Sequence, residues 1–505
     1  MNYNELKKLK SGSDVRGIAV ADKGGNITLT DEAVYCIVRG FISWLEKRCG
    51  TKPEKIAVGH DVRISAERIQ AKTVEAINDA GCSAALCGLC STPSMFMLLK
   101  SGKGGCDASI MITASHLPYD RNGLKFFTPE GGPDGSDIDD ILRLSAQEWK
   151  KTGDKADCFT LNFMPDYCAS LVEKVRSACG QERPLEGKKI IVDAGNGAGG
   201  FFADSVLKPL GANTRGSIFL QPDGTFPNHI PNPENSQAIG CLKKAVLENT
   251  ADLGIIFDTD VDRAGAVDGD GKEINRNELI ALAAAMVLKN GGGTIVTDSV
   301  TSDGLTKFIE KLGGKHVRFK RGYKNVINEA QARCKAGEFC PLAAETSGHV
   351  AFYDNYFLDD GAYLITRILI CLAEQTKSGK NLTDLIADLE RPLEEDEVRI
   401  TFGAQSSDYR TEGLKIIEDI KNTAAQRCDM RLAPDNYEGV KVSFAKGDGD
   451  GWFLVRMSVH DPVMPINFES NEKGGNRKIA QKLCEILEPY GFLDLTNLYK
   501  FIQKV

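Results

Sequence analysis

The chain has 505 residues, which is enough for several domains that each bury a core of their own. Apolar residues make up 42% of it and charged residues 26%, an ordinary composition for a soluble globular protein. The net charge of −8 leaves no basic footprint, so we expect no nucleic acid partner, and a phosphorylated ligand would need local positive charge.

Membrane and disulfide signals are also missing from the sequence. The longest helix-like apolar stretch, Leu279 to Leu288, is too short to span a bilayer, and residues 1–8 lack the apolar core of a signal peptide. Fifteen cysteines are scattered without a framework, and the Cys87/Cys90 pair lacks the second pair that a zinc site needs. We therefore expect a cytoplasmic protein with free thiols and no membrane partner.

A short apolar run followed by a helix-like segment recurs three times along the chain. The first runs are residues 55–61, 189–195 and 294–299, and each is followed later by a second run, at 110–112, 253–257 and 341–344. Strands that alternate with helices predict α/β units with mainly parallel pairing. The last part differs, with strand-like residues 397–402, 437–444 and 452–457 and helix-like residues 411–427 and 473–487.

These patterns predict an α/β protein with domain boundaries near Asp157, Asn275 and Glu390. Three related α/β domains with mixed, mainly parallel sheets would cover residues 1–157, 158–275 and 276–390. A smaller α+β fourth domain would cover residues 391–505.

The stretch from residue 107 to 127 carries the most chemistry. The apolar run Ile110 to Ile112 leads into a loop rich in Pro, Asp, Asn and Gly, and Leu124 to Phe127 is typical of a returning strand. Ser115 therefore lies where a strand ends, next to His116 and within loop reach of Lys125. That placement suits a nucleophilic hydroxyl with bases nearby, although a capping Ser and a solvated Lys would give the same pattern.

Three carboxylates alternate in the loop after the run 253–257, at Asp258, Asp260 and Asp262. Like charges this close repel each other, and an all-oxygen ligand set suits Mg²⁺, which would remove that cost. A solvated acidic turn is the plain alternative. The residues also partly fit the D-x-D-x-[TV] nucleophile motif of haloacid-dehalogenase-type phosphatases, but Asp262 occupies the last position and Ser115 would then have no role.

The pattern T-A-S-H-x-P-x-x-x-N-G-x-K at Thr113 to Lys125 resembles the phosphoserine loop of the α-D-phosphohexomutases, the phosphoglucomutase and phosphomannomutase superfamily. Four further loops resemble that family, at residues 13–17, 258–263, 345–349 and 456–462. Two of these loops, and the segment upstream of the loop at 345–349, also depart from its pattern. Thr259 and Val261 replace the two glycines of the acidic loop, Val459 and His460 alter the last loop, and Tyr323 replaces a His.

The resemblance covers nearly the whole chain and implies four domains around a central cleft. The implied reaction is reversible phosphoryl transfer between the 1- and 6-positions of a hexose phosphate, glucose or mannose, through a phosphoserine and a hexose bisphosphate. The implied site consists of Ser115 as phosphate carrier and metal contact, Asp258, Asp260 and Asp262 as Mg²⁺ ligands, Arg16 and Arg263 for charge neutralisation, Lys125 or His116 for proton movement, Glu345, Ser347 and His349 for the sugar, and Arg456, Ser458 and His460 for the distal phosphate.

The altered last loop leaves one further possibility open. A relative that binds sugar phosphates without turning them over would keep the same fold, although the intact Ser115, acidic loop and Glu345 argue against it. We expect a monomer or a small homo-oligomer.

Overall fold

The computed structural model describes residues 1–21, 25–151, 156–289, 291–403, 405–406, 408–434, 436–458 and 461–503. The chain divides into two compact units, Met1–Met286 with Ser347–Leu385, and Val287–Thr346 with Ile386–Val505. Each unit therefore combines two separate stretches of sequence. The boundaries near Asp157, Asn275 and Glu390 stay predictions.

A seven-stranded mixed sheet opens the first unit, with the order β1-β2-β6-β5-β3-β4-β7. Its strands are β1 (Lys10–Ser11), β2 (Asp14–Ile18), β3 (Lys55–His60), β4 (Ser83–Leu89), β5 (Ala108–Ile112), β6 (Arg121–Phe127) and β7 (Cys158–Thr160). β3 pairs in parallel with β4 and β5, whereas β6 is antiparallel to β5 and β2. The predicted strand at 110–112 is confirmed and buried throughout.

The returning strand begins earlier than predicted. The sequence predicts a loop that lasts until the strand at Leu124, but β6 starts at Arg121, and residues 121–123 pair with Ile18, Gly17 and Arg16 of β2. The turn-forming Asn122 and Gly123 are accepted in a strand because β2 offers them a partner that local sequence does not show. Gly123 is required there, since a Cβ would lie 2.3 Å from the carbonyl oxygen of Val15.

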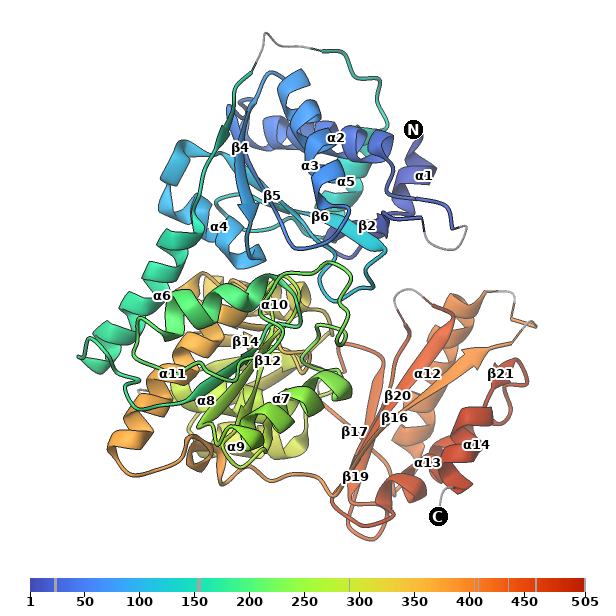
Figure 1. The fold of residues 1–505 in the computed structure, drawn as a ribbon. Helices are drawn as coiled ribbons and strands as arrows, with labels where there is room; N and C mark the ends of the chain where they lie inside the picture. Colours follow the sequence, from blue (N-terminus) through green and yellow to red (C-terminus); the bar gives the residue numbers. More distant parts are fainter. Residues whose placement is uncertain are drawn as a thin grey trace. The chain divides into compact units, whose positions relative to one another are not determined.

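Helices cover both faces of this sheet (Figure 1). They are α1 (Tyr3–Lys7), α2 (Asp31–Cys49), α3 (Ala66–Asp79), α4 (Thr92–Ser101) and α5 (Gly135–Ser145). α2 begins at the N-cap Thr30, whose side chain accepts from Ala33 N, and ends at Gly50 in a left-handed conformation. Its buried Phe41 stacks on Phe126 of β6 with ring centroids 4.4 Å apart, which anchors the strand that carries Lys125.

The second sheet of the first unit has the order β11-β10-β9-β8. Its strands are β8 (Ile190–Asp193), β9 (Leu253–Phe257), β10 (Ala264–Asp268) and β11 (Glu273–Ile274). The first unit also contains the helices α6 (Met164–Cys179), α7 (Ser236–Glu248), most of α8 (Arg276–Leu288) and α11 (Gly361–Lys377), and the strand β15 (Val350–Phe352). β8 and β9 are parallel, and β9 and β10 form an antiparallel pair. The acidic loop is therefore the connection between two buried, paired strands.

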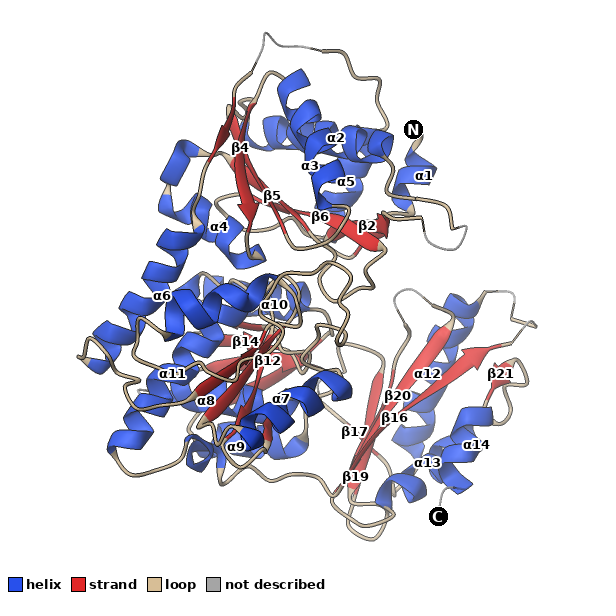
Figure 2. Cartoon of the chain, viewed as in Figure 1, coloured by secondary structure: helices blue, strands red, loops and turns tan. Residues whose placement is uncertain are grey.

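The second unit contains the parallel strands β13, β12 and β14, in that order, followed by an antiparallel sheet with the order β17-β18-β19-β20-β16-β21. The strands are β12 (Thr294–Asp298), β13 (Lys315–Phe319), β14 (Leu342–Ala344), β16 (Glu394–Phe402), β17 (Arg431–Leu432), β18 (Val440–Phe444), β19 (Gly451–Val455), β20 (Val463–Ser470) and β21 (Leu493–Asp494). The helices are α9 (Asp303–Lys311), α10 (Tyr323–Lys335), α12 (Tyr409–Gln426), α13 (Gly475–Leu487) and α14 (Thr496–Gln503). α12, α13 and α14 cover one face of the antiparallel sheet (Figure 2), as the predicted α+β pattern requires.

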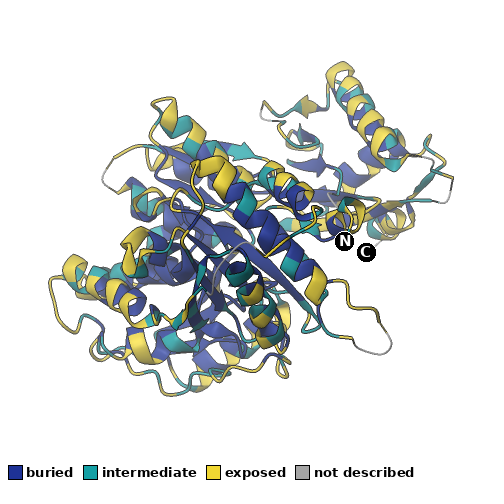
Figure 3. Ribbon diagram, turned by 90° about the horizontal axis from the view of Figure 1, so that it is seen from above, coloured by how far each residue is buried: buried dark blue, intermediate teal, exposed yellow. Residues whose placement is uncertain are grey.

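Burial follows the strands. Figure 3 shows strands that are largely buried and helices that expose one side, which is the pattern of α/β layers with separate cores. The predicted fold class, α/β with mixed sheets and an additional smaller domain, is confirmed. The fifteen cysteines are free, and within the described ranges every helix is too short or too polar to cross a lipid bilayer.

Candidate active site

Ser115 lies in the loop between β5 and β6, 3% exposed and with a φ of 52°. Its Oγ donates to Oδ2 of Asp258 at 3.0 Å and accepts from Nη2 of Arg263 at 3.2 Å. A carboxylate and a guanidinium of the acidic loop therefore both contact the hydroxyl of the predicted nucleophile. Arg263 lies 148 positions from Ser115 in the sequence.

His116 stands next to this hydroxyl as a neutral imidazole. Nη2 of Arg263 donates to its Nδ1 at 2.6 Å, and because a guanidinium can only donate, the ring proton must be on Nε2. Burial, and then the charges of Arg263 and Arg16, lower the pKa of His116 to about 2. The imidazole is therefore uncharged at neutral pH and contributes no positive charge to the site.

The three aspartates of the acidic loop lie together and are all buried. Each offers a carboxylate oxygen, and these three oxygens are within 4.8 Å of one another. Oδ1 of Asp260 and Oδ1 of Asp262 are buried without a hydrogen bond to any described residue. Burial, and then the charges of Asp262 and Asp260, raise the pKa of Asp258 well above its usual value. Buried oxygens without hydrogen bonds, on converging carboxylates, are a donor set that fits a divalent cation.

Lys125 and Thr92 hold the same loop from the first domain. Nζ of Lys125 donates to Oδ2 of Asp260 at 3.1 Å and to Oδ2 of Asp262 at 2.5 Å. The hydroxyl of Thr92 donates to Oδ2 of Asp260 at 2.5 Å. Burial alone would raise the pKa of Asp262, but Lys125 and the neighbouring His349 and Arg263 outweigh it and hold that pKa below its usual range.

The backbone of the acidic loop keeps a conformation that suits glycine. Val261, which stands where relatives of the resembling family have Gly, has a φ of 67°, and its carbonyl accepts from Gly361 N at 3.1 Å. Thr259, at the other replaced position, has no positive φ. The replacement has therefore left the loop in place, with one strained residue in it.

Arg16 lies beside the phosphoserine loop. Its Nη2 donates to Asp14 at 2.8 Å and its Nη1 to the carbonyl of Ala114 at 3.5 Å. Since Ala114 precedes Ser115, the guanidinium is within one residue of the predicted nucleophile.

The loop after β14 places its side chains in two surroundings. Ser347 and His349 belong to the first unit, where their Oγ and Nδ1 are 2.9 Å apart and Nε2 of His349 lies 3.9 Å from Oδ1 of Asp262. Glu345 belongs to the second unit, where its Oε1 accepts from Gly322 N at 2.5 Å. A sugar-binding role for these three residues stays a prediction.

In the second unit Arg456 is 7% exposed, and its Nη1 lies 3.9 Å from Oε1 of Glu438. The amide of Ser458 donates to the carbonyl of Val463 at 2.9 Å, and its Oγ accepts from Asp461 N at 3.3 Å. His460 and Val459 lie outside the described residues, so the predicted contact of His460 with a phosphate stays a prediction.

Several residues at these loops escaped the sequence analysis. Glu438 accepts from Ser299 Oγ at 2.7 Å and from Arg321 N at 3.0 Å, and so ties two loops of the second unit to the neighbourhood of Arg456. Asp61 and Arg63 contact the phosphoserine loop. Their signal was available, because they directly follow β3, a parallel neighbour of β5, and such strands end at the same sheet edge.

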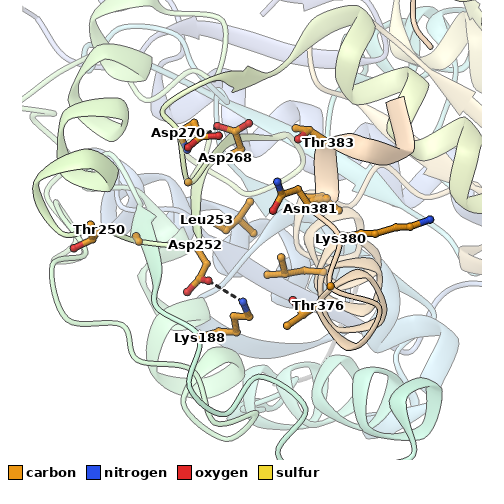
Figure 4. Close-up of a pocket in the computed structure, with 15 residues that line it drawn as sticks. Lys188, Thr250, Asp252, Leu253, Asp268, Asp270, Thr376, Lys380, Asn381 and Thr383 are labelled. Atoms are coloured by element: carbon orange, nitrogen blue, oxygen red, sulfur yellow. Dashed lines mark hydrogen bonds and ion pairs between the residues drawn. The ribbon is translucent and has the colours of Figure 1, made fainter. Parts of the chain in front are cut away.

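A separate cavity of about 490 Å³ lies elsewhere in the first unit (Figure 4). None of the candidate residues lines it. Lys188 donates to Oδ1 of Asp252 at 2.8 Å, and Asp268 accepts from the amides of Asp270 and Lys272 at 3.1 and 2.8 Å. The carboxylates of Asp252 and Asp268 are thus engaged locally, and the described residues of this cavity offer no arrangement for group transfer comparable to that at Ser115.

Comparison with known proteins agrees with this geometry. Models of three phosphoglucomutase/phosphomannomutase domains match the chain, alpha/beta/alpha domain I at residues 7–152, domain II at 165–271 and domain III at 275–392. The phosphomannomutase/phosphoglucomutase of Pseudomonas syringae pv. tomato is 31% identical over 471 residues, 92% of each chain. The phosphoglucomutase of Neisseria gonorrhoeae is 29% identical over 479 residues, 94% of this chain and 95% of that protein.

A solved structure extends the likeness to the fold. The crystal structure of a phosphoglucomutase/phosphomannomutase family protein from Burkholderia thailandensis has a TM-score of 0.79 and 25% identity, over 97% of this chain and 98% of that one. The chain belongs to the phosphoglucomutase/phosphomannomutase family.

Proposed function

We propose that the protein is a phosphohexomutase that moves a phosphoryl group reversibly between the 1- and 6-positions of a hexose phosphate. Phosphorylated Ser115 transfers its phosphoryl group to the free hydroxyl of the sugar monophosphate, so that the bond from phosphorus to Ser115 Oγ breaks and a bond to the sugar oxygen forms. The hexose bisphosphate then returns its other phosphoryl group to Ser115. The observation that carries this proposal is the hydroxyl of Ser115 between Asp258 and Arg263.

Phosphoryl transfer depends mostly on positioning and on charge neutralisation, and this chain supplies both. Arg263 donates to Ser115 Oγ and would stabilise the negative charge that develops there when the phosphoryl group leaves. Arg16, whose Nη1 donates to the carbonyl of Ala114, would do the same. The sugar hydroxyl must lose a proton as it attacks, and Lys125 and His116 are the candidates for receiving it.

The two candidates differ in their surroundings. The Nδ1 lone pair of His116 already accepts from Arg263, so this atom is poorly placed to take a proton. Lys125 donates to the carboxylates of Asp260 and Asp262. It could pass its own proton to one of these carboxylates as it takes the proton of the sugar hydroxyl, and we therefore favour Lys125.

Mg²⁺ is the cation that we assign to the acidic loop. Three carboxylates carry three negative charges at neutral pH if all are ionised, and Lys125 and Arg263 balance two of them. Asp258, Asp260 and Asp262 would hold the ion, with the phosphate of Ser115 as a further contact. Bound Mg²⁺ would neutralise charge on the phosphoryl oxygens.

Six residues are assigned to substrate binding, three to the sugar and three to the phosphate that is not transferred. Glu345, Ser347 and His349 would accept and donate hydrogen bonds to sugar hydroxyls, since carboxylate, hydroxyl and imidazole together offer both kinds of group. Arg456, Ser458 and His460 would bind the phosphate that is not being transferred, with the guanidinium of Arg456 as its main charge. The ligands are then a hexose monophosphate and a hexose bisphosphate.

Replacement of the nucleophile tests the proposal. Ser115→Ala should lower kcat by at least ~1,000-fold in an assay of hexose 1-phosphates with Mg²⁺, because no other group can carry the phosphate. The purified wild type should contain phosphoserine at position 115, which mass spectrometry detects. Ser101→Ala, at the exposed end of α4, is the matched control and should keep full activity.

Two results would contradict this mechanism. Full turnover in Ser115→Ala would remove the phosphoserine from it. A phosphoenzyme that hydroxylamine cleaves would indicate an acyl phosphate at Asp258, as in haloacid-dehalogenase-type phosphatases, because a phosphoserine resists that reagent. A protein that binds hexose phosphates but turns none over would be the non-catalytic relative.

A further inference from the structure

Arg63 is buried behind the phosphoserine loop and holds its main chain. The residue is 2% exposed, and its side chain is 0% exposed. Its two terminal nitrogens donate to the carbonyl oxygens of Ser115, Leu117, Pro118 and Arg121, at 2.5, 2.6, 2.7 and 2.8 Å. One guanidinium therefore gathers four carbonyls of a seven-residue stretch, which only its planar fork of donors can do.

A closed circuit of hydrogen bonds runs from Arg63 through the main chain of Ser115. The amide and Nε of Arg63 donate to Asp61 at 2.9 and 3.2 Å, and the hydroxyl of Thr113 donates to Asp61 at 2.7 Å. That hydroxyl accepts from Ser115 N at 2.9 Å, and Arg63 binds Ser115 O. Both main-chain polar groups of Ser115 are thus fixed from β3's end of the sheet.

Ser115 needs such support because of its backbone conformation. A φ of 52° is left-handed, and an L-residue other than Gly adopts it only where the surroundings impose it. The direction of Oγ follows from the backbone. In the observed conformation it points at Asp258 and Arg263, and a return to an ordinary φ would move it away from them.

A loop of the second domain covers the guanidinium. The ring of Phe226 lies 5.3 Å from Cζ of Arg63, within cation–π range. Gly224 lies so close that a Cβ on it would be 2.3 Å from the carbonyl oxygen of Val62. This cover keeps water from competing for the donors, so the charge-assisted hydrogen bonds act in a dry surrounding.

We propose that Arg63 is a positioning residue for phosphoryl transfer, which sets the left-handed backbone of Ser115 and so aims its Oγ. This inference rests on the proposed role of Ser115 as the phosphate carrier. The guanidinium binds only protein groups in the contacts described, and its side chain is 0% exposed, so it does not bind substrate. Its loss should lower kcat and leave KM for the hexose phosphate nearly unchanged.

Arg63→Lys tests the proposal with the charge retained. An ammonium has three donors and no fork, so it cannot reach all four carbonyls, and the loop should relax. We expect kcat to fall by about 10- to 100-fold, the order that a misplacement of about 1 Å causes, while KM changes by less than about twofold. Arg39→Lys is the matched control. Arg39 is 4% exposed and donates to Tyr35 OH and Lys150 O at 3.1 and 3.0 Å, away from this loop, so kcat should not change.

Hydrogen exchange gives a second readout that does not depend on turnover. Amides of residues 113–123 should exchange at least about tenfold faster in Arg63→Lys than in wild type, and at the wild-type rate in Arg39→Lys. Arg63→Ala, where it folds, should regain part of its kcat when methylguanidinium fills the vacated space. If it does not fold, the Lys variant decides alone.

The outcomes separate this inference from the proposed function. Wild-type kcat in Arg63→Lys, an equal loss in Arg39→Lys, or a loss carried by KM would overturn the positioning role. If the wild type showed no mutase activity, the proposed function would fail, and unchanged exchange of residues 113–123 in Arg63→Lys would then overturn the positioning role independently.

Discussion

Val261 shows how a single residue can keep a loop whose usual glycine is gone. It has a φ of 67°, is 0% exposed, and lies between two of the three candidate metal ligands. A β-branched side chain in the left-handed region is strained, and the burial of that side chain opposes the strain. The net cost is small enough for the loop to persist.

The strain at Val261 predicts an unusual order of stability. At most positions Gly is less stable than Ala by about 0.5–1 kcal/mol, because it loses more backbone freedom on folding. Val261→Gly should instead be more stable than Val261→Ala by about 1 kcal/mol, since only Gly is free of the left-handed penalty. Urea denaturation measures both variants. Ala264→Gly, in the neighbouring strand β10, is the control, and there the Gly variant should be less stable than the wild type with Ala. If Gly were less stable than Ala at position 261 as well, the proposed strain at Val261 would be refuted.

Asp298, at the end of β12, has a side-chain carboxyl that stays protonated to a higher pH than an ordinary aspartate. Burial, and then the charge of Glu345, raise its pKa to about 7, while Arg321 and the hydroxyl of Thr346, which donates to it at 2.8 Å, act in the opposite direction. Because Glu345 is a candidate sugar ligand, this pair links the predicted site to the stability of the second unit.

The raised pKa of Asp298 predicts how stability changes with pH. Between about pH 4 and pH 7 the unfolded chain has released this proton and the folded chain keeps it, so the free energy of unfolding falls as pH rises. The loss is on the order of a few kcal/mol and ends above the folded pKa. Asp298→Asn should remove this slope, and Glu345→Gln should make it end at a lower pH, because the pKa of Asp298 in the folded protein falls. Urea midpoints at several pH values measure it, and an unchanged slope in Asp298→Asn would assign it to other groups.

At the scale of elements, the loop between β8 and α7 supports the site without containing a catalytic group. Gly224 and Phe226 of this loop approach Arg63, and Asn232 accepts from Nη1 of Arg263 at 3.3 Å. This single loop thus contacts both Arg63, which binds the main chain of Ser115, and Arg263, which binds its hydroxyl.

Gly224 should therefore be the sensitive point of this loop. A Cβ there would meet Val62 O at 2.3 Å, so Gly224→Ala must displace the backbone next to Arg63 and should destabilise the protein by about 1–3 kcal/mol. Gly240, inside α7, has open space around it, and Gly240→Ala should stabilise by up to about 1 kcal/mol. Thermal unfolding of both variants checks the contrast. Equal effects would show that the close approach at Gly224 is not a constraint.

At the scale of the whole molecule, the candidate groups are divided between the two compact units. Ser115, Lys125 and the three aspartates belong to the first unit, whereas Glu345, Arg456 and Ser458 belong to the second. Any ligand of the acidic loop alone should therefore stabilise one unit selectively, because binding stabilises only the structure that forms the site.

Metal binding tests this division. Mg²⁺ at about 100 times its Kd should stabilise the first unit by about 2.7 kcal/mol and slow hydrogen exchange around residues 253–264, with little effect on residues 391–503. A chelator should reverse the protection and abolish turnover. Asp260→Asn should weaken the protection while leaving the fold intact. Equal protection by Mg²⁺ in Asp260→Asn would place the ion elsewhere.

The sequence by itself determined the fold class, the family and most of the candidate groups. Apolar runs such as 253–257 predict buried strands because burial on both faces requires apolar residues at consecutive positions, and β9 has those bounds. The phosphoserine loop and the acidic loop were recognisable because their chemistry needs particular side chains at short spacing. Apolar runs and closely spaced functional side chains are properties of short segments, so the amino-acid sequence alone reveals them.

Only the tertiary structure decided how those groups act. The neutral state of His116 depends on its burial and then on Arg263, 147 positions away, and we propose that the backbone of Ser115 depends on Arg63, 52 positions away. β6 begins at Arg121 because β2 pairs with it, and Glu438 is relevant because Arg321 and Ser299 converge on it. Burial, charge proximity and strand pairing are properties of residues brought together by folding, so no spacing along the chain contains them.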